Sequence, residues 1–92
     1  MEKRKILVAD DDPTVLDLYC ELLEQEGYEV VRATNGREAL ESIRQERVDL
    51  AILDLKMPVM TGIEVLQQLY REGDPTPIVV STAHGDWKGD LD

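Results

Sequence analysis

The chain has 92 residues and a formal net charge of −10, because 20 acidic side chains outnumber the 10 Lys and Arg. This balance excludes the usual nucleic-acid-binding face, which needs clustered basic side chains to neutralise phosphates, and it argues against adhesion to an anionic membrane surface. With 42% hydrophobic and 33% charged residues, the composition is that of a globular protein, and the length allows one domain.

Neither export nor membrane insertion is expected. The apolar run Ile6–Ala9 behind the basic N-terminus is too short for a signal-peptide core, and no stretch approaches the roughly 20 apolar residues of a membrane span. Cys20 is the single cysteine, so no intrachain disulfide can form, and its place in an apolar helical pattern indicates a core residue rather than a nucleophile. We therefore expect a cytoplasmic protein.

The first third of the chain predicts a strand, a helix and a second strand. Ile6–Ala9 is a continuous apolar run, typical of a strand buried on both faces. Asp12 is placed to cap a helix that begins at Pro13 and ends at Gly27. Tyr28–Ala33 is the second strand candidate. The apolar stripe of the helix consists of Val15, Leu16, Tyr19, Leu22 and Leu23.

The rest of the chain continues the alternation. Its predicted elements are a helix over Arg37–Glu46, a strand over Leu50–Leu53, a loop over Leu55–Thr61, a helix that begins near Gly62 and a strand over Ile78–Ser81. Residues 84–92 form a polar tail in which no element is predicted. Strands that alternate with helices in this way predict an α/β fold, a parallel sheet covered by helices on both faces.

Carboxylates follow two of the predicted strands directly. Asp10 and Asp11 come after the first strand and Asp54 after the third. In a doubly wound sheet, ligands bind beyond the carboxyl ends of the strands, so neighbouring strands would bring these carboxylates together. Their mutual repulsion calls for a divalent cation, and Mg²⁺ suits such oxygen ligands. A carboxylate held there can accept a phosphoryl group. Asp12 is better explained as the helix cap.

Three segments resemble the receiver domains of two-component response regulators. Ile6–Asp12 resembles the first strand and acidic pair, Leu53–Pro58 followed by Thr61-Gly62 resembles the phosphoacceptor segment, and Val80–Ala83 resembles the segment with the switch residue. The segments occur in the family's order and spacing, and the resemblance covers residues 5 to about 85. It implies a flavodoxin-like doubly wound parallel sheet with strand order 2-1-3-4.

The resemblance also implies a set of site residues. Asp54 would be the phosphoacceptor, and Mg²⁺ would be bound by Asp10, Asp11, Asp54 and the backbone carbonyl of Lys56. A sensor histidine kinase or phosphotransfer protein would donate the phosphoryl group.

Further positions carry supporting roles in the same family. Thr82 and Ala83 would contact the phosphoryl group, with Thr82 as the switch residue, while Met57, Pro58 and Gly62 would shape the loop around the site. The domain would act as a signalling switch and not as a turnover enzyme, with only self-phosphorylation and slow autodephosphorylation.

Two other functions stay open at this point. The chain could be a dimerisation or scaffold module that works without phosphorylation, or an engineered receiver fragment. A phosphohydrolase fits poorly, because those enzymes commonly carry a second Asp two residues after the nucleophile, where Lys56 stands here.

The pattern departs from the family after the fourth strand. A fourth helix, a fifth strand that ends in a lysine and a fifth helix would normally follow, and no residue here matches that lysine, since Lys88 is too close to Thr82. We expect a single receiver domain over residues 1–92 that is truncated after its fourth strand. If the chain is complete at residue 92, its exposed edge predicts self-association or a complementing segment.

Overall fold

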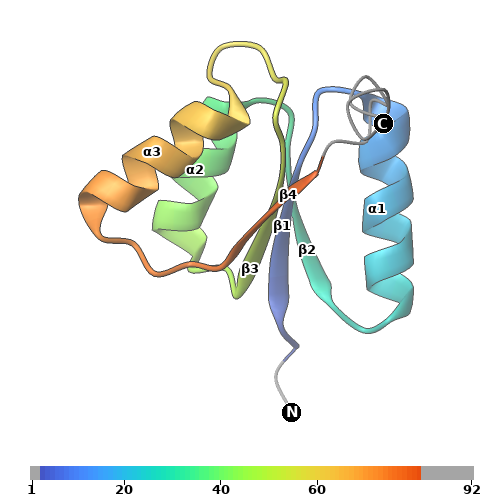
Figure 1. Ribbon diagram of the computed structural model, residues 1–92. Coiled ribbons are helices and arrows are strands. Elements are labelled where there is room, and N and C mark those ends of the chain that lie inside the picture. The colour runs from blue at the N-terminus through green and yellow to red at the C-terminus, as the bar shows by residue number, and fades with distance from the viewer. Residues whose placement is uncertain (1–2, 82–92) are drawn as a thin grey trace, which may run out of the picture.

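The computed structural model describes residues 3–81 (Figure 1). Its elements are β1 (Lys5–Ala9), α1 (Pro13–Gln25), β2 (Glu29–Ala33), α2 (Gly36–Glu46), β3 (Leu50–Asp54), α3 (Gly62–Glu72) and β4 (Ile78–Ser81). Every predicted element in this range is present, and the bounds differ by a residue or two, as at α2, which begins at Gly36 rather than Arg37. The predictions for Thr82, Ala83 and the polar tail lie outside the described residues.

The four strands form one parallel sheet in the order β2-β1-β3-β4. Helix α1 covers one face of the sheet, and α2 and α3 lie together on the other (Figure 1). The predicted flavodoxin-like doubly wound arrangement is therefore confirmed. Among the described residues, no helix is long and apolar enough to span a membrane.

Each face of the sheet has its own apolar core. On the side of α2 and α3, Leu7 and Leu53 are fully buried beside Val65 and Leu69 of α3. On the side of α1, Ile6 and Val8 pack against Leu16 and Cys20, which confirms Cys20 as a core residue. Burial raises the pKa of the Cys20 thiol. Strand β1 is buried on both faces, whereas β3 is buried on the side of α2 and α3 and only half-buried on the side of α1, at Leu50 and Ile52.

The predicted stripe of α1 is wrong at Leu22, whose side chain is 52% exposed. The buried line runs along Leu16 and Cys20, with Tyr19 and Leu23 beside it. At 3.6 residues per turn, Leu22 falls well to one side of this line. An apolar residue next to a stripe in sequence is therefore not always part of the buried face.

Side-chain caps fix where the helices begin. The Asp12 carboxylate accepts a 2.9 Å hydrogen bond from the Thr14 N–H and caps α1, as predicted. Before α2, the N–H and hydroxyl of Thr34 both donate to Glu38 at 2.8 Å. These bonds hold the pKa of the Glu38 carboxyl below its usual range, so their stabilisation is present above the ordinary carboxyl pKa and is lost as the pH falls through the lowered one.

A backbone contact locks the start of α2 against the loop that follows β3. A Cβ atom on Gly36 would lie 2.0 Å from the Met60 carbonyl oxygen, so only glycine allows this approach. The contact joins two segments that flank the carboxyl end of the sheet, and it positions the loop from outside.

Replacing Gly36 with Ala should destabilise the fold. Alanine favours a helix by up to about 1 kcal/mol over glycine, but the clash with Met60 should outweigh this gain and leave a net loss of about 1–3 kcal/mol. Urea unfolding measures the change. The control is Arg37→Ala, one residue along on the exposed side of α2, which should change stability by no more than about 0.5 kcal/mol. Equal urea midpoints for Gly36→Ala and wild type would show that the contact with Met60 does not require glycine.

Candidate functional site

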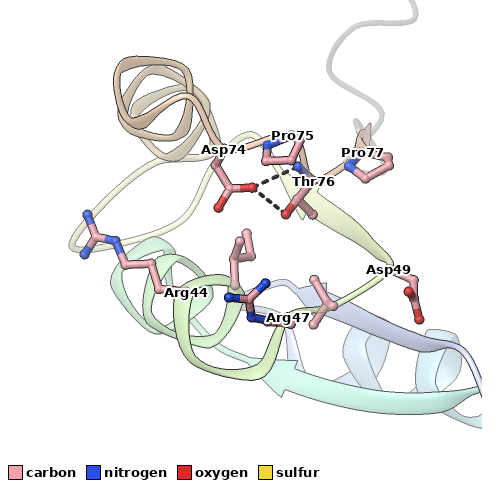
Figure 2. A pocket seen from close by; sticks show the side chains of 9 residues that line it. Arg44, Arg47, Asp49, Asp74, Pro75, Thr76 and Pro77 are labelled. Carbon is pink, nitrogen blue, oxygen red and sulfur yellow. Dashed lines mark hydrogen bonds between the residues drawn. The ribbon is translucent and has the colours of Figure 1, made fainter.

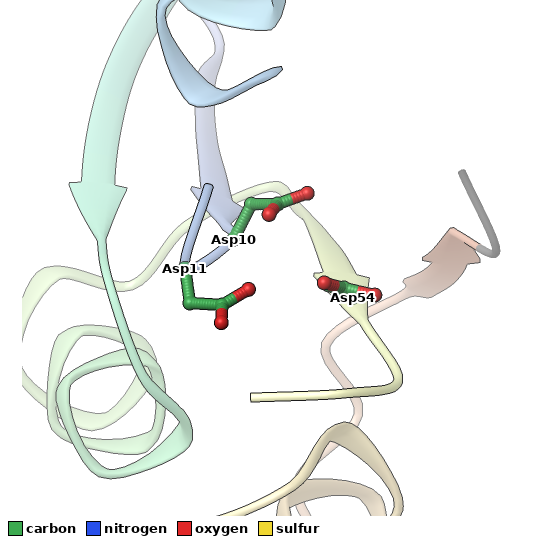
Figure 3. A group of neighbouring side chains, drawn as sticks. All are labelled: Asp10, Asp11 and Asp54. Atoms are coloured by element: carbon green, nitrogen blue, oxygen red, sulfur yellow. The ribbon is translucent and has the colours of Figure 1, made fainter. Parts of the chain in front are cut away.

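Three carboxylates meet at the carboxyl end of the central strands. Ala9 of β1 pairs with Leu53 of β3, so the next residues, Asp10 and Asp54, stand at the same level of the sheet. Asp11 follows Asp10 in the turn toward α1, and its carboxylate points toward the other two (Figure 3). The parallel register of two buried strands therefore places the three side chains.

The cluster is tight and open on one side. One carboxylate oxygen from each of Asp10, Asp11 and Asp54 lies within 4.8 Å of the other two. Asp10 and Asp54 are only 2% and 1% exposed, whereas Asp11 is exposed. Two acids thus form the floor of the cluster, and the third stands at its mouth.

Local hydrogen bonds orient the first strand's acids. The Asp10 carboxylate accepts a 2.9 Å bond from the Asp12 N–H, and the Asp10 N–H donates to the Ala33 carbonyl at 3.1 Å. The carboxylate of Asp12 turns the other way, into the first turn of α1. The structure therefore brings together Asp10, Asp11 and Asp54 and leaves Asp12 outside the group.

The loop after β3 wraps closely around Asp54. Its carboxylate accepts a 3.3 Å hydrogen bond from the Lys56 N–H. A Cβ atom on Gly62 would lie 2.4 Å from the Asp54 carbonyl oxygen, and the Gly62 N–H donates to the Leu55 carbonyl at 3.2 Å. Met57 is 6% exposed and belongs to the core. These contacts give the loop a fixed path from the site to α3.

The outer part of this loop makes a tight turn around Val59. The Met60 N–H donates to the Pro58 carbonyl at 2.7 Å, which closes a γ-turn. Val59 has a φ of 69° and is 71% exposed. A β-branched residue is strained in this conformation, so the surrounding contacts must hold the turn.

The donor set fits a hard divalent cation. Carboxylate oxygens are the ligands that Mg²⁺ prefers, and this ion commonly keeps several waters beside one or two protein carboxylates. The exposed side of the cluster leaves room for water or for an oxygen of a phosphoryl group. Without a counter-charge, three carboxylates at this spacing repel one another.

Sequence reasoning did not find the closest contacts around the site. The sequence analysis assigns no role to Gly36, and the left-handed Val59 has no sequence signal, because β-branched residues rarely adopt that conformation. Tyr19 was read only as part of the apolar stripe, although its hydroxyl reaches Ser81 of β4 at 3.4 Å. A glycine directly before the predicted helix is a hint of a close backbone approach.

A separate pocket opens at the opposite edge of the sheet, between the end of α2 and the segment before β4 (Figure 2). It has a volume of about 480 Å³. Several of its polar groups already have partners: Asp74 accepts from the N–H and hydroxyl of Thr76, Asp49 accepts from the Lys5 N–H, and Arg44 pairs with Glu72. The cluster of Asp10, Asp11 and Asp54 at the carboxyl ends of the strands is the candidate reactive site.

Comparisons with known proteins agree with this arrangement. The family model of the response regulator receiver domain matches residues 6–90. Sporulation initiation phosphotransferase F of Bacillus subtilis is 37% identical over 86 residues, which are 94% of this chain and 69% of that protein. The response regulator MprA of Mycolicibacterium vanbaalenii is 46% identical over 79 residues, which are 86% of this chain but only 34% of MprA. The chain thus spans a third of this longer relative.

Solved structures show the same fold. The response regulator TrrA of Thermotoga maritima, in complex with Mg²⁺ and BeF, has a TM-score of 0.83 at 39% identity, over 96% of this chain and 76% of that one. The receiver domain of the Francisella response regulator 1452 has a TM-score of 0.85 at 29% identity, over 97% of this chain and 74% of that one.

Neutralising one acid should stabilise the protein when no divalent ion is present. In EDTA, Asp11→Asn should raise the free energy of unfolding by roughly 1 kcal/mol, because it removes a charge that two nearby carboxylates repel. Chemical denaturation at low ionic strength measures this. Glu21→Gln is the control, since it removes one negative charge from the exposed side of α1 and should have little effect. An equal gain in both variants would show that overall charge, not the cluster, is responsible.

Proposed function

The chain belongs to the response regulator receiver domain family, and from this premise we propose that it accepts a phosphoryl group on Asp54 in a reaction that depends on Mg²⁺. The observation that carries the proposal is the position of Asp54, which is 1% exposed and within 4.8 Å, oxygen to oxygen, of two further carboxylates. A buried carboxylate beside two others can attack a phosphoryl group when a metal ion offsets the negative charge of the group and of the carboxylates.

The roles of the residues follow from their positions. Asp10, Asp11 and Asp54 would hold the ion through carboxylate oxygens, and Lys56 would add its backbone carbonyl. When bound there, Mg²⁺ would supply positive charge that offsets the charge developing on the phosphoryl oxygens. An oxygen of Asp54 attacks phosphorus and forms an acyl phosphate, while the N–P bond of a donor phosphohistidine breaks and the imidazole keeps the electron pair and takes up a proton.

The proposed donor is a sensor histidine kinase or a phosphotransfer protein, and the proposed output is a signalling state. Phosphorylation places about two negative charges and three strong acceptor oxygens beside Asp54. Thr82 and Ala83 would contact these oxygens, with Thr82 as the switch residue. The domain would turn over only through slow loss of its own phosphoryl group.

The loop residues would keep the acceptor in place. Met57 packs in the core and anchors the loop, and Gly62 lets the loop pass close to the Asp54 carbonyl. The Pro58 carbonyl accepts the hydrogen bond that closes the γ-turn. Positioning of this kind is the main contribution that a protein makes to phosphoryl transfer.

Mg²⁺ should stabilise the folded protein through the acidic cluster. At a concentration one hundred times its Kd, a ligand that binds only the folded state adds about 2.7 kcal/mol to the free energy of unfolding. Wild type should show this increase in a thermal or urea titration, and Asp11→Asn and Asp54→Asn should lose most of it.

Two variants serve as controls for the Mg²⁺ titration. Asp49→Asn, at the opposite edge of the sheet, should keep the full increase. Asp12→Ala should lose about 1 kcal/mol of stability through its helix cap but keep the response to Mg²⁺. If Asp12→Ala abolished the response, Asp12 would have to be counted among the ligands.

The phosphoacceptor is tested with acetyl phosphate. Wild type incubated with this donor and Mg²⁺ should gain the mass of one phosphoryl group, and the product should be cleaved by hydroxylamine as an acyl phosphate is. Asp54→Asn and omission of Mg²⁺ should each abolish the gain, whereas Asp49→Asn should be labelled like wild type. Labelling of Asp54→Asn equal to that of wild type would contradict the assignment.

A further inference from the structure

The pocket at the edge of the sheet opposite the acidic cluster has one wall that belongs to the core (Figure 2). Ile43 and Val48 line it and are only 2% and 6% exposed. Both pack in the core on the side of α2 and α3, so this wall is apolar and fixed. The volume of about 480 Å³ lies within the range of about 300–1,000 Å³ that is usual for sites of small molecules.

The facing wall is the segment between α3 and β4, which is tied down at both ends. The Asp74 N–H donates to the Leu69 carbonyl at 3.0 Å, and the Pro77 carbonyl accepts from the Ala51 N–H at 3.0 Å. Between these ties, the N–H and hydroxyl of Thr76 both donate to Oδ1 of Asp74, at 2.8 and 2.6 Å. These bonds hold the Asp74 carboxylate at the pocket, and none of the described residues donates to its Oδ2.

Arg47 follows α2 in a backbone conformation that favours glycine. Its φ of 53° and ψ of 63° are left-handed, whereas α3 has Gly73 at the same kind of position, with a φ of 70°. A residue with a Cβ atom is disfavoured there. The Arg47 guanidinium lies across the pocket from the side chains of Asp74 and Thr76 (Figure 2). Of the carboxylates in the described part of the chain, none forms an ion pair with it.

The last turn of α2 lines the same pocket with backbone carbonyl groups that the chain leaves uncapped. After α1, the Glu26 N–H donates to the Leu22 carbonyl at 3.3 Å, and after α3 the Gly73 N–H donates to the Tyr70 carbonyl at 3.1 Å. Within residues 3–81, no backbone N–H beyond α2 makes such a bond to its last turn. Carbonyls at a helix C-terminus carry partial negative charge and attract a cationic group.

We propose that this pocket binds a small molecule with one cationic and one anionic group, of which an α-amino acid with an apolar side chain is the simplest. The ligand carboxylate pairs with the Arg47 guanidinium, and the ammonium group pairs with the Asp74 carboxylate and the last carbonyls of α2. The apolar side chain lies against Ile43 and Val48. A ligand with a single charge would leave either Arg47 or Asp74 without a counter-charge, so the pocket selects for both groups together.

Titrations of ¹⁵N-labelled protein, followed by NMR, test the ligand class. L-Leucine should shift the amide resonances of Val48 and Thr76 to saturation and leave those of Asp10 and Asp54 in place. 4-Methylpentanoate lacks the ammonium group of leucine, and 3-methylbutylamine lacks its carboxylate. Each should bind at least about tenfold more weakly, which is the loss of one hydrogen bond to a charged group. Equal affinity for leucine and either analogue would overturn the proposal, as would the absence of saturable shifts with leucine, methionine and phenylalanine alike.

Variants of the two charged residues test their roles in the same titration. Arg47→Gln and Asp74→Asn should each weaken the binding of L-leucine at least about tenfold, and Asp74→Asn keeps an oxygen that can accept from Thr76. Arg37→Gln is the matched control, because it removes one positive charge from the exposed side of α2 at its other end, and it should bind leucine like wild type. Equal weakening in Arg37→Gln and Arg47→Gln would assign the effect to overall charge and overturn the proposal.

Discussion

The parallel pairing of β1 with β3 is the constraint from which the site follows. Both strands bury one face against α2 and α3, and that packing fixes their register. A slip of one residue in either strand would turn Leu7 or Leu53 toward the other face and would also separate Asp10 from Asp54. The apolar core and the acidic cluster are thus two consequences of one alignment, and the site cannot be moved without repacking the sheet.

The cluster places charge where the fold is least able to tolerate it. Asp10 and Asp54 have lost nearly all their contact with water, and burial of a charge is costly unless it is paired or binds a metal. Asp11, at the exposed mouth, still feels the other two charges, but water screens part of this repulsion. A cation bound between the buried carboxylates of Asp10 and Asp54 would therefore remove the most costly repulsion in the cluster. This links binding to folding stability.

The sequence predicted the elements whose signal is local. No knowledge of distant contacts was needed to predict the apolar strands before Asp10 and Asp54, the helix cap at Asp12 or the order of the elements. The structure agrees with these predictions. The prediction was wrong at Leu22, because a stripe drawn from apolar composition does not show which line of the helix meets the sheet. The contacts of Gly36 with Met60 and of Tyr19 with Ser81 depend on how separate segments meet in space. No local pattern encodes them.

The loop on the α3 side of Asp54 is held by close backbone contacts. On the side of α3, Gly36 and Gly62 allow backbone to press against backbone, and a shift there would force atoms that are already in contact. On the side of β4, Ser81 pairs in register with Asp54, and its hydroxyl lies 3.4 Å from that of Tyr19. Under the proposed function, the loop between β3 and α3 would therefore keep its path when Asp54 carries a phosphoryl group.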